Sequence, residues 1–345
     1  MRTYMIGAGA MGSVHGGLLA HAGFDVTLID PREDHIERVK REGVIVEGVR
    51  GRHVIRLPAQ TSHAGLPRAG FAIIFTDANA TKEAARTAAQ VLDPDGFALT
   101  LQNGIGNVEA LVPELGKERV IAGVTMNSAA LPEAGRAAYT NAGITSIGEL
   151  DGRTTQRIEE VARMLNQAQI ETRVIADPMS QIWTKFVLNC AINPLTAVTG
   201  LRSGEMFRTP EVNALQDRIL DEILAVVERK GIRLAEPDMR KKIKAHCRVR
   251  YNRPSMMQHV ERGQQTEIDA LNGALIREAQ ALGVPVPYNE AVVAIVKGVE
   301  KSRRQLLHEP PRDYARLEAE AQAEAAMAPD SDSPRPSVQS KLKAR

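Results

Sequence analysis

The chain of 345 residues contains only two cysteines, Cys190 and Cys247. Two are too few for a disulfide framework or a cysteine-based zinc site, so we expect a cytoplasmic protein without a bound metal. No apolar run approaches the roughly 18 residues that are needed to cross a bilayer. The N-terminus leads directly into a predicted strand and leaves no room for a signal peptide. We therefore expect no membrane partner.

An excess of charge of either sign is also absent. The sequence has 44 Lys and Arg residues against 42 Asp and Glu residues, and the two signs are mixed along the chain. Nucleic-acid-binding proteins usually concentrate positive charge, so we expect no nucleic-acid partner. No internal repeat is visible, and the length favours two domains that each bury a core of their own.

A glycine-rich segment is the first motif that the sequence does contain. GAGAMG follows a short apolar strand, Thr3 to Ile6, and precedes an alanine-rich helix that we expect to end near Ala22. The next predicted strand, FDVTLID, ends at Asp30. This context predicts a dinucleotide-binding turn. Its glycines allow a tight turn, the approach of a pyrophosphate and the packing of helix on strand. A purely structural turn is the alternative.

Strands and helices continue to alternate up to about residue 176. VIVEGVRGRHVIRL predicts a hairpin around Gly48 and Gly51, and further strands are predicted at 71–76, 97–101 and 120–125. The alternation predicts an α/β fold with a Rossmann-type, doubly wound parallel sheet that binds ligands at the carboxyl ends of its strands. Two loops at such ends supply candidates, Thr76 in TDAN and Asn103 in QNGIGN, although Asn-Gly alone is more often only a turn.

Long helical periods replace this pattern near Asp177-Pro178. They predict an all-helical C-terminal domain over 177–308, after a Rossmann domain over 1–176. We expect helices at about 179–198, 210–230, 236–248, 254–282 with a break near Gly263, and 288–307. An Ala/Glu/Arg stretch after Pro310 and Pro311 leads into PDSDSPRPSVQSKLKAR, which has almost no apolar side chains, and we expect residues 309–345 to be a disordered tail.

One of these helices contains a polar seam. In IWTKFVLNCAINPLTAVTG, Lys185, Asn189 and Asn193 recur every four residues on an otherwise apolar helix, within roughly 80° of one another. An ammonium group is costly to bury without a partner. If this helix packs across the carboxyl edge of the sheet, Lys185 faces a nicotinamide and can protonate the oxygen of a ketone. Partial desolvation would lower its pKa toward the working pH. The alternative is a lysine whose amine reaches solvent.

A second polar group occurs in RPSMMQHVERGQQTEIDALNG. Glu267 could reach the cleft and bind a substrate hydroxyl. Equally, Ser255 could only cap a helix, and Glu267 and Asp269 could only face solvent. From its position alone, His259 is expected on a helix surface.

These motifs, in this order, resemble those of the ketopantoate reductase family over about residues 1–307. The resemblance rests on GAGAMG, LQNGIGN, KFVLNCAINPLTA, and SMMQ and TEIDALNG followed by GVPVP. It implies NAD(P)H-dependent reduction of a 2-oxo acid to a 2-hydroxy acid, with ketopantoate as the lead substrate and Lys185 as the general acid. For the other candidates it implies Asn103 near the nicotinamide and the lysine, Asn189 and Asn193 along the substrate, Ser255 at the substrate carboxylate and Glu267 at a hydroxyl.

The chain departs from the family pattern at several positions. NADPH-using members usually carry an arginine at the position of Pro31 and a lysine in the loop that here holds Ala78 and Asn79. Ser203 replaces an asparagine before Gly-Glu, and His259 replaces an aspartate after Ser-x-x-Gln. These changes leave hydride transfer intact and leave the cofactor and the substrate open. Ser203 and His259 remain candidate substrate-binding residues.

The candidate cofactor-binding residues favour NAD(H) over NADP(H). Asp30 at the end of the second strand can accept both ribose hydroxyls of NAD and would repel a 2′-phosphate. Arg32 argues the other way, because it could turn under such a phosphate. The full set is Gly7, Ala8, Gly9, Ala10, Met11, Gly12, Asp30, Arg32, Thr76 and Asn103.

Two alternatives to a ketopantoate reductase stay open. One is a family member that acts on a different small oxo or hydroxy acid with NAD(H). The other is a dinucleotide-binding sensor without catalysis, which needs the glycine turn but no proton donor. The sequence does not decide whether the chain forms a homodimer.

Overall fold

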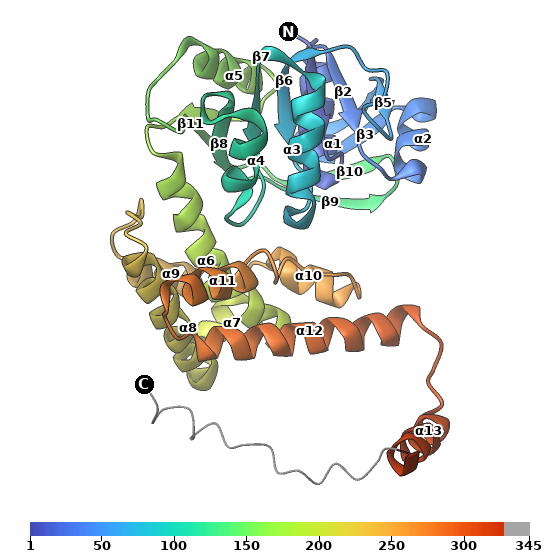
Figure 1. Cartoon of the computed structure of the whole chain (residues 1–345), viewed down its shortest axis with the longest axis vertical. Coiled ribbons are helices and arrows are strands. Elements are labelled where there is room, and N and C mark those ends of the chain that lie inside the picture. The colour runs from blue at the N-terminus through green and yellow to red at the C-terminus, as the bar shows by residue number, and fades with distance from the viewer. Residues whose placement is uncertain (328–345) are drawn as a thin grey trace.

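An eight-stranded sheet organises the N-terminal half of the computed structural model, which describes residues 1–327 (Figure 1). Its strand order is β12-β11-β8-β7-β6-β1-β2-β5. Neighbours pair in parallel, except that β11 runs antiparallel to β8. The strands are β1 (Thr3–Ile6), β2 (Val26–Ile29), β5 (Ala59–Gln60), β6 (Ala69–Ile74), β7 (Leu92–Thr100), β8 (Val120–Thr125), β11 (Thr145–Glu149) and β12 (Thr172–Val174). The chain reverses direction across the sheet at β1, which places a crevice at the carboxyl ends of β1 and β6.

Helices cover both faces of this sheet, and β1 shows why. Tyr4 and Ile6 pack with helices α3 (Thr81–Val91) and α4 (Asn107–Leu115), whereas Met5 packs with residues of the opposite face. That face carries α1 (Ala10–His21), α2 (Glu33–Glu42) and α5 (Gln156–Gln167). Successive side chains of a strand point to opposite faces, so a strand buried on both must be apolar throughout. The predicted α/β class is confirmed.

A second, four-stranded sheet has the order β4-β3-β10-β9. The predicted hairpin forms its first two strands, β3 (Val44–Gly48) and β4 (Gly51–Ile55), and Gly48 pairs with Gly51. Strands β9 (Ser128–Glu133) and β10 (Arg136–Asn141) complete it, with β10 parallel to β3. The sequence analysis did not predict β9 and β10, because their alanines and polar residues lack the β-branched pattern of a buried strand.

The C-terminal half is helical (Figure 1). Its helices are α6 (Pro178–Thr199), α7 (Ser203–Arg208), α8 (Pro210–Arg229), α9 (Met239–Val249), α10 (Ser255–Glu261), α11 (Asn272–Leu282) and α12 (Pro287–His308). The short α7 was not predicted, and the region predicted as one helix at 254–282 is two helices separated by a loop at 262–271. Helix α6 begins where Asp177 accepts a hydrogen bond from the Ser180 amide. We keep 176/177 as the proposed domain boundary.

Pro194 interrupts the hydrogen-bond ladder of α6, because proline has no N–H to donate to the carbonyl four residues earlier. That carbonyl, on Cys190, accepts instead from the Asn272 side chain of α11 at 3.0 Å. The next carbonyl, on Ala191, accepts from the Gln216 side chain of α8 at 3.2 Å. Polar side chains of two neighbouring helices therefore complete the backbone of α6.

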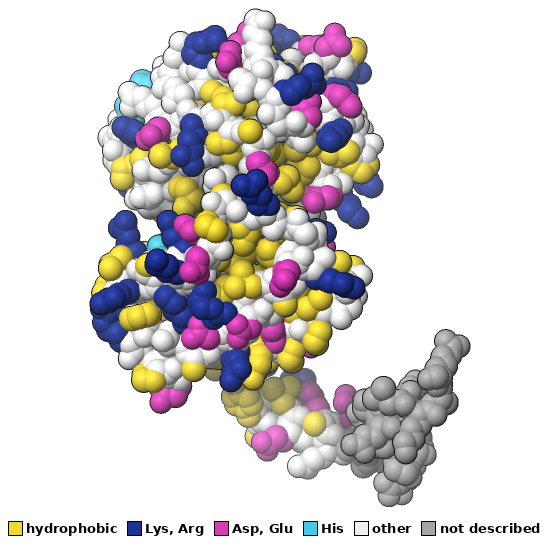
Figure 2. All heavy atoms as spheres, turned by 90° about the vertical axis from the view of Figure 1, so that its left-hand side faces the viewer, with side chains coloured by type: hydrophobic (Ala, Val, Ile, Leu, Met, Phe, Trp, Pro, Cys, Tyr) yellow, Lys and Arg dark blue, Asp and Glu magenta, His cyan; other side chains and the backbone are white. Residues whose placement is uncertain are grey.

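One apolar cluster joins the two halves. It contains Trp183 and Phe186 of α6 together with Val124 of β8 and Ile105 of the loop after β7. This contact fixes α6 against the carboxyl edge of the sheet. Among the described residues, no helix is both long and apolar enough to cross a membrane. On the face in Figure 2, basic and acidic side chains are interspersed over both lobes.

The tail differs from the prediction of disorder over 309–345. Tyr314–Met327 form a further helix, α13, whose described side chains are exposed. Its alternating alanine and glutamate residues have high intrinsic helix propensity, which the prediction from low apolar content did not weigh. Residues 328–345 lie outside the described part of the chain.

Candidate active site

Three glycines give the turn after β1 its shape. Gly7 has φ +91°, and a Cβ there would lie 2.6 Å from the Thr76 amide nitrogen. A Cβ on Gly12 would lie 1.9 Å from the Gly7 carbonyl oxygen, whereas a Cβ on Gly9 would meet nothing within 4 Å. Larger residues are thus sterically excluded at Gly7 and Gly12, and open space lies beside Gly9. The turn can accept a pyrophosphate at the uncapped N-terminus of α1.

Asp30 lies at the end of β2 and is already fully engaged. One carboxylate oxygen accepts from the Ala8 amide at 2.8 Å, and the other accepts from Arg32 Nε at 2.9 Å. Arg32 Nη2 also donates to the Ala8 carbonyl at 3.1 Å. The carboxylate is buried, whereas the Arg32 side chain is 43% exposed. The expectation that Asp30 is free to accept ribose hydroxyls is therefore incomplete, because Arg32 must first move aside.

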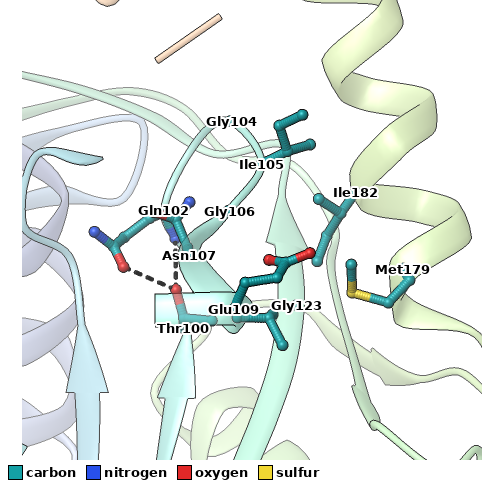
Figure 3. A pocket seen from close by; sticks show the side chains of 11 residues that line it. Thr100, Gln102, Gly104, Ile105, Gly106, Asn107, Glu109, Gly123, Met179 and Ile182 are labelled. Atoms are coloured by element: carbon teal, nitrogen blue, oxygen red, sulfur yellow. Dashed lines mark hydrogen bonds between the residues drawn. The ribbon is translucent and has the colours of Figure 1, made fainter. Parts of the chain in front are cut away.

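The side chain of Gln102, the first residue of the QNGIGN loop, fixes the base of the loop by hydrogen bonds. Its amide donates to the Thr76 carbonyl and to the Thr81 hydroxyl, both at 2.8 Å, and its oxygen accepts from Thr100. Figure 3 shows the Thr100–Gln102 pair beneath the loop. These bonds tie the loop after β7 to the loop after β6. They orient Asn103 toward the helical half, a role for Gln102 that the sequence analysis missed.

Lys185 meets this loop from α6. Its Nζ donates to Asn103 Oδ1 at 2.8 Å and to the Thr125 carbonyl at 2.7 Å. Thr125 ends β8 and Asn103 follows β7, so the amine lies at the carboxyl edge of the sheet. The prediction that the lysine lies near Asn103 agrees with this geometry. The Thr125 carbonyl was not predicted, because a backbone acceptor leaves no trace in side-chain patterns.

Burial lowers the pKa of Lys185 to about 8, while the charge of Glu267 acts in the opposite direction. An ammonium group loses hydration on burial, which disfavours its charged form. The Lys185 side chain is half-buried, so the amine keeps access to a ligand. Its pKa is close to the pH at which a general acid works best.

Asn189 and Asn193 follow Lys185 along α6, one half-buried and the other buried. Within residues 1–327, neither amide side chain makes a hydrogen bond with the protein, although the Asn193 carbonyl accepts from Thr196. Buried amides are normally paired. These two groups therefore have donors and acceptors available for a ligand.

Ser255, His259 and Glu267 lie together on the other side of the seam. His259 Nδ1 bonds to Glu267 at 3.1 Å. That hydrogen bond raises the pKa of His259, and the charge of Asp77 across the cleft adds to it. Burial would raise the pKa of Glu267, but hydrogen bonds from His259 and Ser255 outweigh burial and leave it lowered. The group holds a carboxylate paired with a histidine, facing the loop after β6.

Two alternatives and one expectation for this region are corrected. Ser255 does not cap α10, because it is the first helical residue and Pro254 occupies the cap position. Glu267 is not on a solvated helix face but in the loop before α11, and His259 is half-buried rather than a surface residue.

Ser203 lies apart from these groups. Its hydroxyl is fully buried at the start of α7 and donates to Asn252 at 3.1 Å. Within the described residues it has no contact with the Lys185 seam, so its role as a substrate-binding residue stays a prediction.

A hollow of about 10 Å³ lies beneath the QNGIGN loop, between Asn107 and Ile182 (Figure 3). It has room for about one water molecule and is too small for an organic acid. The substrate would instead bind along the polar seam, outside this hollow.

Comparison with known proteins identifies the family. The model of the family described as "Ketopantoate reductase PanE/ApbA" matches residues 3–152, and the model of its C-terminal domain matches residues 177–300. The chain belongs to the ketopantoate reductase family. The family resemblance predicted from the sequence motifs is therefore confirmed.

Curated relatives support the same assignment across both halves. The 2-dehydropantoate 2-reductase of Pyrococcus horikoshii is 35% identical over 300 residues, which cover 87% of this chain and 98% of the relative. The corresponding enzyme of Archaeoglobus fulgidus is 33% identical over 301 residues, with the same coverage.

Solved structures agree with the fold. A PanE/ApbA family ketopantoate reductase from Ralstonia eutropha JMP134 superposes with a TM-score of 0.80 at 28% identity, covering 88% of this chain and 100% of that structure. A D-mandelate dehydrogenase in complex with NADH and anilino(oxo)acetate also has a TM-score of 0.80, at 25% identity and the same coverage. The predicted architecture, a Rossmann sheet followed by a helical domain, is confirmed.

Proposed function

We propose that this member of the ketopantoate reductase family reduces a 2-oxo acid to a 2-hydroxy acid with a nicotinamide cofactor, with ketopantoate as the lead substrate. The observation that carries the proposal is the position of Lys185, whose amine lies at the carboxyl edge of the sheet between Asn103 and the Thr125 carbonyl. A sensor that only binds a dinucleotide would not need a desolvated lysine there.

The residues of the first half fit such a cofactor. The open space at Gly9 and the uncapped N-terminus of α1 suit a pyrophosphate, and Asp30 and Arg32 lie where the adenosine ribose would bind. When bound in its reduced form, the nicotinamide supplies the hydride.

Lys185 acts as the general acid in this proposal. An ammonium group has three N–H donors, and Asn103 and Thr125 take two of them. The third is available for the ketone oxygen. Negative charge grows on that oxygen as the carbonyl carbon is reduced, and the ammonium group stabilises the charge and then transfers its proton. Asn103 and the Thr125 carbonyl keep the amine aimed at the reacting oxygen throughout.

The remaining seam binds the substrate. The amides of Asn189 and Asn193, which have no partner within residues 1–327, offer hydrogen bonds along its length. Ser255 turns its hydroxyl from Glu267 to the substrate carboxylate, and Glu267 accepts from a substrate hydroxyl. A second candidate, an oxo acid other than ketopantoate, is favoured by one observation. One oxygen of Glu267 already bonds to His259, so the group that meets the far end of the substrate is a carboxylate–histidine pair rather than a free carboxylate.

We further propose that NADH is preferred to NADPH. A 2′-phosphate would approach the Asp30 carboxylate, and the charge of Arg32 is already balanced by its ion pair with Asp30 at 2.9 Å. Like charges brought together at this range repel. Removing Arg32 would leave the Asp30 carboxylate without its counter-charge, so Arg32→Ala should lower kcat/KM with NADPH by a larger factor than it changes kcat/KM with NADH.

The decisive experiment follows cofactor oxidation with a panel of 2-oxo acids, run with NADH and NADPH in parallel. We expect turnover of at least one oxo acid with kcat/KM near 10⁴ M⁻¹s⁻¹ or above, roughly the range of an enzyme on its own substrate. If ketopantoate falls far below that value while another acid reaches it, the second candidate is correct. Dinucleotide binding without turnover of any acid would favour the sensor instead, and a higher kcat/KM with NADPH would contradict the cofactor preference.

A further inference from the structure

A buried chain of hydrogen bonds runs behind the glycine-rich turn. The Gly135 amide, between β9 and β10, donates to His35 Nδ1 at 2.9 Å. His35 Nε2 lies 3.2 Å from the Ser13 hydroxyl, and that hydroxyl donates to the Ala8 carbonyl at 2.8 Å. Ser13 is fully buried and His35 is 1% exposed. The chain thus connects the second sheet, through α2 and α1, to the turn itself.

The donors and acceptors fit only one form of His35. Because Nδ1 accepts from the Gly135 amide, it carries no proton, so Nε2 carries the proton and donates to Ser13. Ser13 in turn uses its own proton on Ala8. Every bond points the same way, from Gly135 toward the turn. A protonated His35 would set an Nδ1–H against the Gly135 N–H and break the first bond.

Ala8 is the point where this chain meets the rest of the turn. Its carbonyl accepts from both Ser13 and Arg32, and its amide donates to Asp30. These bonds therefore hold both peptide units that flank Ala8. The Ala8 carbonyl shares its peptide plane with the Gly9 N–H, so its orientation decides where that N–H points at the start of α1.

We propose that Ser13 and His35 are positioning residues for the dinucleotide, holding the Ala8 peptide so that the turn is formed before the cofactor binds. This inference rests on the proposed function, since it requires that the turn bind a dinucleotide. A turn that is already ordered spares the cofactor the cost of ordering it. The two side chains act on affinity, because neither lies at the reacting atoms.

The chain of hydrogen bonds from Gly135 through His35 and Ser13 to Ala8, called the relay below, also predicts how the affinity for the cofactor depends on pH. The charged and titratable groups that face His35 are Arg32, Asp30 and Asp34, and burial, followed by the charge of Arg32, lowers the pKa of His35. The relay is intact while His35 is neutral. Cofactor affinity should therefore be retained at neutral pH and weaken as the pH falls below the ordinary histidine value of about 6.5.

The test measures the Kd of NADH and NADPH by nicotinamide fluorescence in the full-length protein, together with kcat at saturating cofactor. Ser13→Ala removes two bonds of the relay. We expect it to raise Kd by roughly fivefold to twentyfold, the effect of a lost buried hydrogen bond or two, and to change kcat by less than about twofold. Ser146→Ala is the matched control, because Ser146 is also a buried serine of this half and accepts from Arg173 on the far edge of the sheet.

Two substitutions of His35 test its two hydrogen bonds separately. The amide of His35→Gln can replace Nε2 and keep the bond to Ser13, whereas the amide of His35→Asn can replace Nδ1 and keep only the bond to Gly135. We expect His35→Asn to weaken binding as much as Ser13→Ala does, and His35→Gln to weaken it less and to lose the dependence of Kd on acidic pH. Combined with Ser13→Ala, His35→Asn should add almost nothing, because both act through one chain.

The outcomes separate this inference from the proposed function. A wild-type protein that binds neither dinucleotide overturns both. If the wild type binds and Ser13→Ala changes Kd no more than Ser146→Ala does, or if the effects of Ser13→Ala and His35→Asn simply add, the relay is overturned while the proposed function stands. Melting temperatures show whether each variant has folded. If Ser13→Ala or His35→Asn has not, the dependence of Kd on acidic pH is compared between the wild type and His35→Gln. The same dependence in both would overturn the relay.

Discussion

The glycine-rich turn and the polar seam of α6 face the same edge of the sheet, yet they are built in opposite ways. In the turn, the Ala8 amide and carbonyl and both oxygens of Asp30 already have partners within the protein. In the seam, the amides of Asn189 and Asn193 have none among the described residues. The proposed cofactor side is therefore formed in advance, whereas the proposed substrate side keeps amides that can exchange solvent for a ligand.

Lys185 is only partly paired within the protein, since two of its N–H donors have partners and one is left. Replacing it should give the largest effect on turnover. We expect Lys185→Ala to lower kcat by about 10² to 10⁴, the usual range for a positioned acid. The Kd of the dinucleotide should hardly change, because the turn that would bind it lies in the other half of the chain.

Lys230→Ala provides the control, because Lys230 lies in the same half and pairs with Glu278 at 2.6 Å rather than with the seam. Pre-steady-state measurements should confirm that chemistry limits the rate. If Lys185→Ala then keeps more than about a third of wild-type turnover, the lysine is not the general acid.

The pH dependence of reduction offers a second way to sharpen the comparison. Lys185 must carry its proton to donate it, and burial lowers its pKa to about 8. We expect kcat/KM for the oxo acid to be constant from neutral pH up to this value and to fall about tenfold per unit above it. A profile that stays flat well above pH 9 would contradict an acid with this pKa.

Two asparagines test the contrast between a paired and an unpaired amide. Within the described part of the chain the Asn189 amide has no partner, whereas Asn272 donates to the Cys190 carbonyl and to Asn289. We expect Asn189→Ala to raise KM for the oxo acid about tenfold with little change in stability. Asn272→Ala should instead cost about 1–3 kcal/mol of stability. Thermal unfolding and steady-state kinetics of both variants measure the difference, and equal effects on stability would mean that the Asn189 amide has a partner in the protein.

The smallest effect is expected from removing residues 312–345. The described side chains of α13 are exposed, so the helix contributes little buried apolar surface. We expect unchanged kcat/KM and a melting temperature within about 5 °C of the full chain, which corresponds to about 2 kcal/mol. A larger drop would show that the tail docks on the body of the protein.

Short-range patterns account for what the sequence predicted well. The turn at Gly7 to Gly12 and the seam on α6 each depend on neighbours within a few residues, and the structure places both at the sheet edge as the pattern implied. The antiparallel β11, the second sheet and the His35–Ser13 relay depend on contacts between segments far apart in the chain. Gly135 and His35 are 100 residues apart, and no local periodicity relates them.

Side-chain partners were the least predictable feature of the candidate site. The sequence placed Asp30 correctly at the end of β2, but it offered no sign that Arg32 would cover the carboxylate. Similarly, Ser203 replaces the asparagine that the family motif carries before Gly-Glu, and its hydroxyl turns inward to Asn252. A motif fixes where the backbone passes, and the rotamer depends on neighbours that the motif does not contain.

Pro194 has a consequence for how this chain can change over generations. The proline leaves the Cys190 carbonyl without its helical donor, and Asn272 fills that vacancy. Losing Asn272 first would leave a carbonyl in the core without a donor, whereas losing Pro194 first would restore the helical donor and make the bond from Asn272 to that carbonyl redundant. The order of mutations therefore matters, and descendants that dispense with the asparagine should be those whose proline was replaced earlier.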